Sequence, residues 1–150
     1  MRASKIAGIG HYVPDNVVTN KDLEKLIETT DEWIQERTGI KERRFVDPKS
    51  DEAPSTMGTK AARIAIKNAG ITPDGIKEIG ALDVRNQCSG FVYAVSIADQ
   101  FIKTGMYNNI LVIGSELHSS GLDMTTRGRG VSVIFGDGAG AVVMQAADKP

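Results

Sequence analysis

The stretch ALDVRNQCSGFVYAVSIADQFI, residues 81–102, is the most informative part of the chain and contains its only cysteine, Cys88. A short apolar segment, Ala81 to Val84, is expected to be a strand, and it leads through a polar turn into the cysteine and a long apolar helical segment. This order predicts a thiol at the first turn of a helix, where unpaired backbone N–H groups and the positive end of the helix dipole face it. Such surroundings lower the pKa of a thiol and favour the nucleophilic thiolate. The alternative is a small buried hydrophobic side chain, the commoner role of a single cysteine.

The composition is that of an ordinary globular protein. The chain has 150 residues, of which 41% are hydrophobic and 25% charged, enough for one compact domain with a core. A net charge of −1 and an aromatic content of 5% disfavour a nucleic-acid partner. One cysteine excludes an internal disulfide framework and a Cys-rich zinc site, and it fits a reduced, cytoplasmic setting. No apolar run reaches the length that crosses a membrane, and the N-terminus lacks the pattern of a signal peptide.

The rest of the chain alternates strand-like and helix-like segments, which is typical of a layered α/β domain. Strands are expected over residues 5–13, 109–114, 131–135 and 141–144, and helices over residues 21–28, 29–38, 55–69 and 89–103. The strand 109–114 is expected to be buried and parallel to the one before Cys88. The helix 89–103 is apolar around most of its circumference, which predicts burial on all sides.

Several residues mark the expected ends of these elements. Asn20 is expected to cap the helix 21–28, and Thr29 to begin the next helix with a capping box. Glycines are expected to end three helices, at Gly39, Gly70 and Gly105. An exposed loop is predicted for Arg43, Arg44 and the polar cluster over residues 47–51.

Two glycine-dense segments raise the possibility of a dinucleotide-binding loop. Residues 136–140 lack the third glycine of the G-x-G-x-x-G pattern and precede a strand, and Gly8-Ile9-Gly10 is followed by Pro14 rather than by a helix. A tight structural turn therefore suits residues 136–140 better, and an NAD-binding domain is disfavoured.

Four motifs in order along the chain carry a resemblance to a known family. They are GIGHYVP at residues 8–14, the Thr-Asp-Glu-Trp-Ile…Arg-Thr-Gly-Ile…Arg block at 30–43, CSGFVYAVSIADQFIKTG at 88–105 and VIFGDGAGAVV at 133–143. Together they resemble the N-terminal half of a β-ketoacyl-[acyl-carrier-protein] synthase III, a condensing enzyme of the thiolase superfamily. The resemblance implies a thiolase-like layered α-β-α-β-α fold, of which residues 1–150 form the N-terminal half-domain.

The junction of Gly80 and Ala81 interrupts that pattern. A strand region begins at Ile76, yet the next strand follows after Gly80, which leaves no room for the crossover that parallel neighbours need. Members of the family carry roughly two dozen more residues here, about the size of a strand plus a crossover. We hypothesise that a disordered segment is missing from the chain as printed; a genuine deletion is the alternative.

The resemblance also implies a two-stage reaction. Cys88 is acylated by acetyl-CoA or another acyl-CoA, and malonyl-ACP then loses carbon dioxide and condenses with the acyl group to give β-ketoacyl-ACP. The family completes its catalytic set with a histidine and an asparagine from the second half of the protein, and neither His11 nor His118 matches that histidine. No metal and no permanently bound cofactor is expected. The family is a cytoplasmic homodimer.

By the same resemblance, four residues are expected to bind coenzyme A. Trp33 is expected to stack on the adenine, with Arg129 on the other face, while Arg37 and Thr29 contact the nucleotide end. An indole and a guanidinium plane both stack on a purine, and arginine pairs with phosphate. The alternative for Trp33 is a half-buried helix aromatic, and Arg127 is the neighbouring alternative to Arg129.

Two other functions remain open at this point. One is a related CoA-dependent condensing enzyme that makes a polyketide, quinolone or olefin precursor, because the second half of the protein and the missing segment line much of the family's acyl pocket. The other is a non-catalytic partner subunit. The presence of Cys88 argues against this second function.

Overall fold

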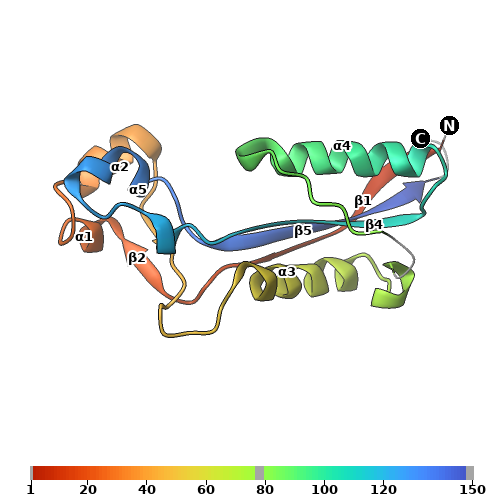
Figure 1. Cartoon of the computed structure of the whole chain (residues 1–150), viewed down its shortest axis with the longest axis horizontal. Helices are drawn as coiled ribbons and strands as arrows, with labels where there is room; N and C mark the ends of the chain where they lie inside the picture. Colours follow the sequence, from red (N-terminus) through yellow and green to blue (C-terminus); the bar gives the residue numbers. More distant parts are fainter. Residues whose placement is uncertain (1, 77–79, 148–150) are drawn as a thin grey trace. The chain divides into compact units, whose positions relative to one another are not determined.

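The computed structural model describes residues 2–76 and 80–147, which divide into two compact units (Figure 1). The first unit contains the described residues of Met1–Tyr12, Ser55–Gly114 and Ala139–Pro150, and the second contains Val13–Pro54 and Ser115–Gly138. The chain leaves the first unit after Tyr12 and again after Gly114, and these excursions build the second unit.

The first unit is built on a three-stranded sheet. Its strands are β1 (Ala3–Tyr12), β4 (Asn109–Glu116) and β5 (Gly138–Ala147), in the order β1-β5-β4. β1 pairs antiparallel with β5 from Ala3 opposite Ala147 to Tyr12 opposite Ala139, with a shift of register between Ile6 and Gly8. The strands expected over 5–13, 109–114 and 141–144 are therefore confirmed.

Helices α3 (Pro54–Asn68) and α4 (Gly90–Lys103) lie on opposite faces of this sheet (Figure 1). β1 approaches α3 so closely that a Cβ added at Gly8 or Gly10 meets backbone atoms of Ala61 and Ala65. Beyond the two helices, Gly70 and Gly105 have φ angles of 70° and 80°, a conformation that favours glycine. Both helices thus end where the sequence predicted.

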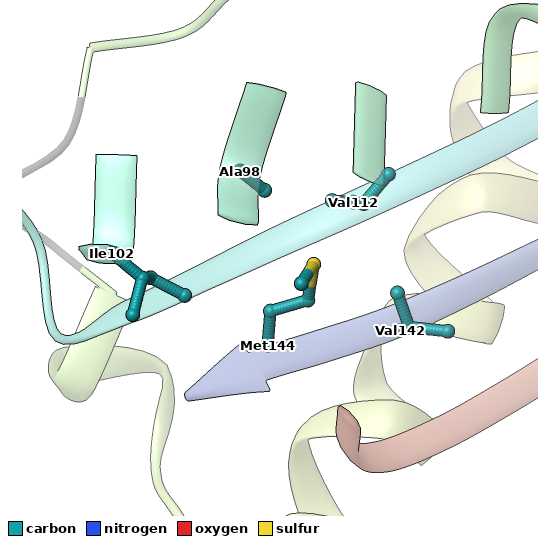
Figure 2. Packing of buried hydrophobic residues seen from close by; sticks show 5 residues of the cluster. All are labelled: Ala98, Ile102, Val112, Val142 and Met144. Atoms are coloured by element: carbon teal, nitrogen blue, oxygen red, sulfur yellow. The ribbon is translucent and has the colours of Figure 1, made fainter. Parts of the chain in front are cut away.

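The core of the first unit lies between α4 and the sheet. Figure 2 shows Ala98 and Ile102 of α4 facing Val112 of β4 and two side chains of β5, Val142 and Met144. All five side chains are buried. This cluster fixes the direction of α4, and hence the place at which its N-terminal end begins.

The opposite face of α4 is exposed in the described chain. Phe91, Val92 and Tyr93 retain 38%, 65% and 56% of their surface, and Ile113 of β4 retains 44%. The expectation that α4 and the strand 109–114 are buried all round is therefore wrong for this chain, because only one face of α4 packs against the sheet.

Residues 81–84 do not form the predicted strand. A strand needs a hydrogen-bonded neighbour, and the sheet neighbour of β4 is β5 rather than this segment. The strand start expected over 76–79 is a 3-10 turn up to Ile76, and residues 77–79 lie outside the described residues.

The second unit combines a small sheet with short helices. β2 (Val17–Thr19) pairs antiparallel with β3 (Glu42–Arg44). The helices are α1 (Asn20–Leu23), α2 (Asp31–Thr38) and α5 (Arg129–Ser132). Leu23, Ile27, Ile34 and Val133 form the buried apolar cluster of this unit.

The helix starts of this unit differ from those predicted. Thr19, not Asn20, caps α1 by accepting a hydrogen bond from the backbone N–H of Asp22, because the Asn20 side chain is engaged elsewhere. Thr30, not Thr29, caps α2 by accepting from the N–H of Trp33. Gly39 ends α2 with a φ of 72°, as predicted.

Two further expectations are wrong in this unit. Residues 131–135 do not form a strand but contain the end of α5 and the turn after it, where Val133 packs into the apolar cluster. Arg43 does not lie in an exposed loop; it belongs to β3 and is 6% exposed.

Candidate active site

Cys88 lies in the short 3-10 turn η2 (Gln87–Ser89), directly before α4. Its thiol is exposed and is not part of a disulfide. The turn is closed by the N–H of Ser89, which donates to the carbonyl oxygen of Asn86 at 3.3 Å. The alternative of a buried hydrophobic cysteine does not hold, and the thiol stands at the N-terminal end of a helix as the sequence predicted.

The residue before the cysteine has an unusual backbone conformation. Gln87 has a φ of +39°, and it is the only residue other than glycine with a positive φ in the part of the chain that the structure describes. Such a conformation is strained for a residue with a Cβ. Strained residues are common where a structure holds a reactive group in place.

Trp33 and two arginines form a cationic platform in the second unit. The guanidinium carbon of Arg37 lies 4.4 Å from the centroid of the Trp33 ring, and that of Arg129 lies 4.6 Å from it. Nη1 of Arg129 donates to the carbonyl oxygen of Glu28 at 2.9 Å, which holds this side chain in place. A platform of this kind can stack a purine and attract a phosphate.

Arg127 does not contribute to this platform. Its guanidinium pairs with the carboxylate of Asp123 at 2.9 Å and is otherwise exposed. Asp123 also accepts hydrogen bonds from Thr125, so Arg127 serves to close this loop. The structure thus brings Arg129 to Trp33 and leaves Arg127 elsewhere.

Thr29 precedes α2, the helix that carries Trp33. Its Oγ1 is buried and has no hydrogen-bond partner among the described residues. A buried hydroxyl without a partner is uncommon and can accept or donate a bond to a ligand.

The glycine-dense turn over 136–140 is held by the buried carboxylate of Asp137. Its oxygens accept hydrogen bonds from the backbone N–H groups of Val46, His118 and Ser119 at 2.7, 2.7 and 2.9 Å. Burial alone would raise the pKa of Asp137, but the hydrogen bonds from Ser119, Val46 and His118 outweigh it and hold the pKa below its ordinary value. The turn is structural, as the sequence predicted.

The two histidines have different surroundings in the described chain. His118 stacks on Phe135 with 4.5 Å between ring centroids, and its Nδ1 is buried without a hydrogen-bond partner in the described chain. His11 lies on β1 opposite Gly140 and is exposed. Within the described residues, no group of three or more histidine, cysteine or acidic side chains could hold a metal ion. In the same residues, no helix is long and apolar enough to cross a membrane.

The buried guanidinium of Arg43 is the polar feature that the sequence reasoning missed. It donates to the carbonyl oxygens of Val18 and Val133, each at 3.2 Å, and to Oδ1 of Asn20 at 2.7 Å. A doublet of arginines beside a polar loop is usually a solvated surface, so composition alone hid this role. The available signal was its place as the last residue of the Thr30–Arg43 motif.

Comparison with known proteins identifies the relatives of this chain. A family model described as 3-oxoacyl-[acyl-carrier-protein (ACP)] synthase III matches residues 82–150. β-Ketoacyl-[acyl-carrier-protein] synthase III 1 of Vibrio vulnificus (strain YJ016) is 46% identical over 174 residues, which cover 98% of this chain and 54% of that protein.

Two solved structures resemble the fold. 3-Oxoacyl-[acyl-carrier-protein] synthase III from Aquifex aeolicus VF5 has a TM-score of 0.90 and 40% identity, over 97% of this chain and 55% of that one. The priming β-ketosynthase from the R1128 polyketide biosynthetic pathway has a TM-score of 0.92 and 33% identity, over 99% and 52%. The chain spans about half the length of the relatives that it matches.

The fold and these likenesses place the chain in the class of thiolase-like α/β folds. Within that class it is similar to about half of a β-ketoacyl-[acyl-carrier-protein] synthase III.

The comparisons also bear on the junction of Gly80 and Ala81. The match to the Vibrio protein extends over 174 positions, whereas 98% of the 150 residues is about 147, so about 27 positions have no counterpart in this chain. The match to the family model begins at residue 82, directly after the junction. Both facts support the predicted missing segment, which stays a prediction.

Proposed function

We propose that the full-length protein is an acyltransferase that starts fatty-acid chains by condensing an acyl group from acyl-CoA with malonyl-ACP. The observation that carries this proposal is the exposed thiol of Cys88 at the N-terminal end of α4, in a chain 46% identical to a β-ketoacyl-[acyl-carrier-protein] synthase III. The proposal includes a cytoplasmic homodimer without a permanently bound cofactor.

The first stage is transfer of the acyl group to the enzyme. The Cys88 thiolate attacks the thioester carbonyl of acyl-CoA, a new carbon–sulfur bond forms, and the bond to the sulfur of coenzyme A breaks. Coenzyme A leaves as a thiolate and takes up a proton. The backbone N–H of Cys88 is a candidate donor to the oxyanion that forms in between, and the start of α4 favours negative charge there.

The second stage is a decarboxylative condensation. Malonyl-ACP loses carbon dioxide, and the electron pair of the broken carbon–carbon bond attacks the acyl carbonyl on Cys88. The Cys88 thiolate then leaves, and β-ketoacyl-ACP is released. This stage needs neutral hydrogen-bond donors at the malonyl thioester, which the family takes from a histidine and an asparagine beyond this chain.

The nucleotide of acyl-CoA is proposed to bind in the second unit. Trp33 and Arg129 are suited to stack on the adenine, and Arg37 to pair with a phosphate. The buried Oγ1 of Thr29, which lacks a partner among the described residues, supports a polar contact with the nucleotide end.

A second candidate function is the priming of a polyketide chain. The likeness to the R1128 priming ketosynthase favours it as the alternative. The two functions share the acylation of Cys88 and differ in the carrier protein that receives the acyl group, so the second stage of the reaction discriminates between them.

The deciding experiment follows a radiolabelled acetyl group on the full-length protein. Acetyl-CoA is expected to label Cys88, and malonyl-ACP from fatty-acid synthesis is then expected to release the label as acetoacetyl-ACP. Cys88→Ala should accept no label, whereas Ser89→Ala, the matched control, should still accept it. Absence of label on the wild-type protein would leave a non-catalytic partner subunit as the better explanation.

A further inference from the structure

The guanidinium of Arg43 is buried in the second unit against uncharged acceptors. Arg43 is 6% exposed, and its three hydrogen bonds end on two backbone carbonyls and one side-chain amide. Its Nε is buried with no partner in the described chain. Burying a charge in this way is costly, and an apolar side chain of similar volume is often as stable or more stable at such a place. Stability alone is therefore a poor reason for an arginine here.

The hydrogen bonds of Arg43 connect it to two separate helices. One of its amino groups, Nη2, donates both to Oδ1 of Asn20 and to the carbonyl oxygen of Val133, the residue that ends α5. Asn20 is 1% exposed, and its Nδ2 donates to the carboxylate of Asp31, the first residue of α2, at 2.7 Å. Arg43 thus contacts the end of α5 directly, through the carbonyl oxygen of Val133. It is connected to the start of α2 indirectly, through Asn20 and Asp31.

These two helices carry the two halves of the cationic platform. Trp33 lies two residues beyond Asp31 in α2, and Arg129 is the first residue of the four-residue helix α5. A helix as short as α5 cannot keep its own orientation, so its position depends on such outside contacts.

We propose that Arg43 is a positioning residue for this platform: it sets the distance between the Trp33 ring and the Arg129 guanidinium at which a purine nucleotide stacks. The inference rests on the proposed binding of coenzyme A by the platform. Arg43 touches no substrate; it acts through Asn20, Asp31 and the carbonyl of Val133.

The test compares two substrates of the full-length protein, acetyl-CoA and acetyl-N-acetylcysteamine, a thioester without the nucleotide. Arg43→Met is expected to raise the KM for acetyl-CoA about tenfold with little change in kcat, because misplaced binding groups weaken ground-state binding. The kinetics with the truncated thioester are expected to stay as in the wild type. The matched control is Arg44→Met, since Arg44 also lies in β3 but donates to the carbonyls of Pro14 and Asp15.

If Arg43 had only a structural role, Arg43→Met would slow the reaction with both thioesters equally. That result would overturn the inference, and so would an unchanged KM for acetyl-CoA. In a Trp33→Ala background, Arg43→Met should change the KM for acetyl-CoA very little, because the two residues act through the same platform. If Trp33→Ala alone leaves that KM unchanged, the nucleotide site of the proposed function is what fails. Should Arg43→Met not fold, Arg43→Lys keeps the charge but cannot bridge both helices, and the same split between substrates is expected.

Discussion

The guanidinium carbon of Arg129 lies 4.6 Å from the centroid of the Trp33 ring, while the guanidinium of Arg37 lies 4.4 Å from it. In the free chain both arginines thus occupy stacking positions on the indole. Arg129 is anchored by a 2.9 Å hydrogen bond to the carbonyl oxygen of Glu28, whereas the contacts of Arg37 are longer, at 3.4 Å to the carbonyl oxygen of Trp33 and 3.7 Å to the exposed carboxylate of Glu36. We expect an incoming purine to displace Arg37 and to keep Arg129.

This difference predicts unequal effects of two variants in the full-length protein. Trp33→Ala is expected to raise the KM for acetyl-CoA about tenfold, since stacking of a base on an aromatic ring contributes about 1–3 kcal/mol. Arg129→Ala should have a larger effect than Arg37→Ala, and steady-state kinetics with acetyl-CoA measure both. An Arg37→Ala protein that loses more affinity than Arg129→Ala would contradict the expected order of displacement.

Gly10 tests the contact between β1 and α3. A Cβ at this position would meet the backbone of Ala61 and Ala65, which cannot move without shifting the helix. Gly10→Ala is therefore expected to lower the free energy of unfolding by about 1–3 kcal/mol. Gly121 has no atom within 4 Å of an added Cβ, so Gly121→Ala should change that free energy by less than about 0.5 kcal/mol. Urea denaturation of the two variants measures the difference, and equal midpoints would show that β1 has room to move.

Gln87 tests the strain beside the nucleophile. Glycine adopts a φ of +39° without the steric cost that a Cβ brings, so Gln87→Gly relieves strain in the folded state. The same substitution makes the unfolded chain more flexible, which lowers the free energy of unfolding by a similar amount. The neighbour Asn86 has a φ of −148° and offers no such gain. We expect Gln87→Gly to be more stable than Asn86→Gly by about 1–2 kcal/mol. Thermal unfolding compares them, and an Asn86→Gly protein as stable as Gln87→Gly would exclude strain at residue 87.

Asp137 predicts a dependence of stability on pH. Its pKa is below the ordinary value of 3.8, so the folded protein gains stability above that value and loses it as the pH falls through the lowered pKa. Asp137→Asn places an amide against three backbone N–H donors, which should cost about 1–3 kcal/mol near neutral pH.

The pH profile separates this contribution from a general packing defect. The difference in unfolding free energy between the wild type and Asp137→Asn should shrink as the pH is lowered from 7 through the titration of Asp137. Urea denaturation at several pH values measures it. A difference that stays constant over this range would assign the effect to packing rather than to the charge.

The sequence predicted the elements that local chemistry determines. Gly39, Gly70 and Gly105 end their helices because they adopt positive φ angles, and the apolar helix after Cys88 lies where its pattern placed it. Trp33 and Arg129 were paired by resemblance alone, and the structure brings their side chains together.

What the sequence did not predict depends on contacts distant along the chain. Residues 131–135 have the branched side chains of a strand, yet α5 forms there because Val133 fits the core and its carbonyl accepts from Arg43. Asn20 has the chemistry of a helix cap, but its side chain links Arg43 to Asp31. Neither set of contacts can be recognised from the neighbouring sequence, because the residues that make them lie in different helices and strands.

Trp33 is the only tryptophan among the 150 residues, and both of its charged neighbours lie against the indole. Indole fluorescence from this segment therefore originates at the platform itself and changes when a guanidinium leaves the ring or another flat group takes its place. The segment therefore carries its own optical reporter of what occupies the indole.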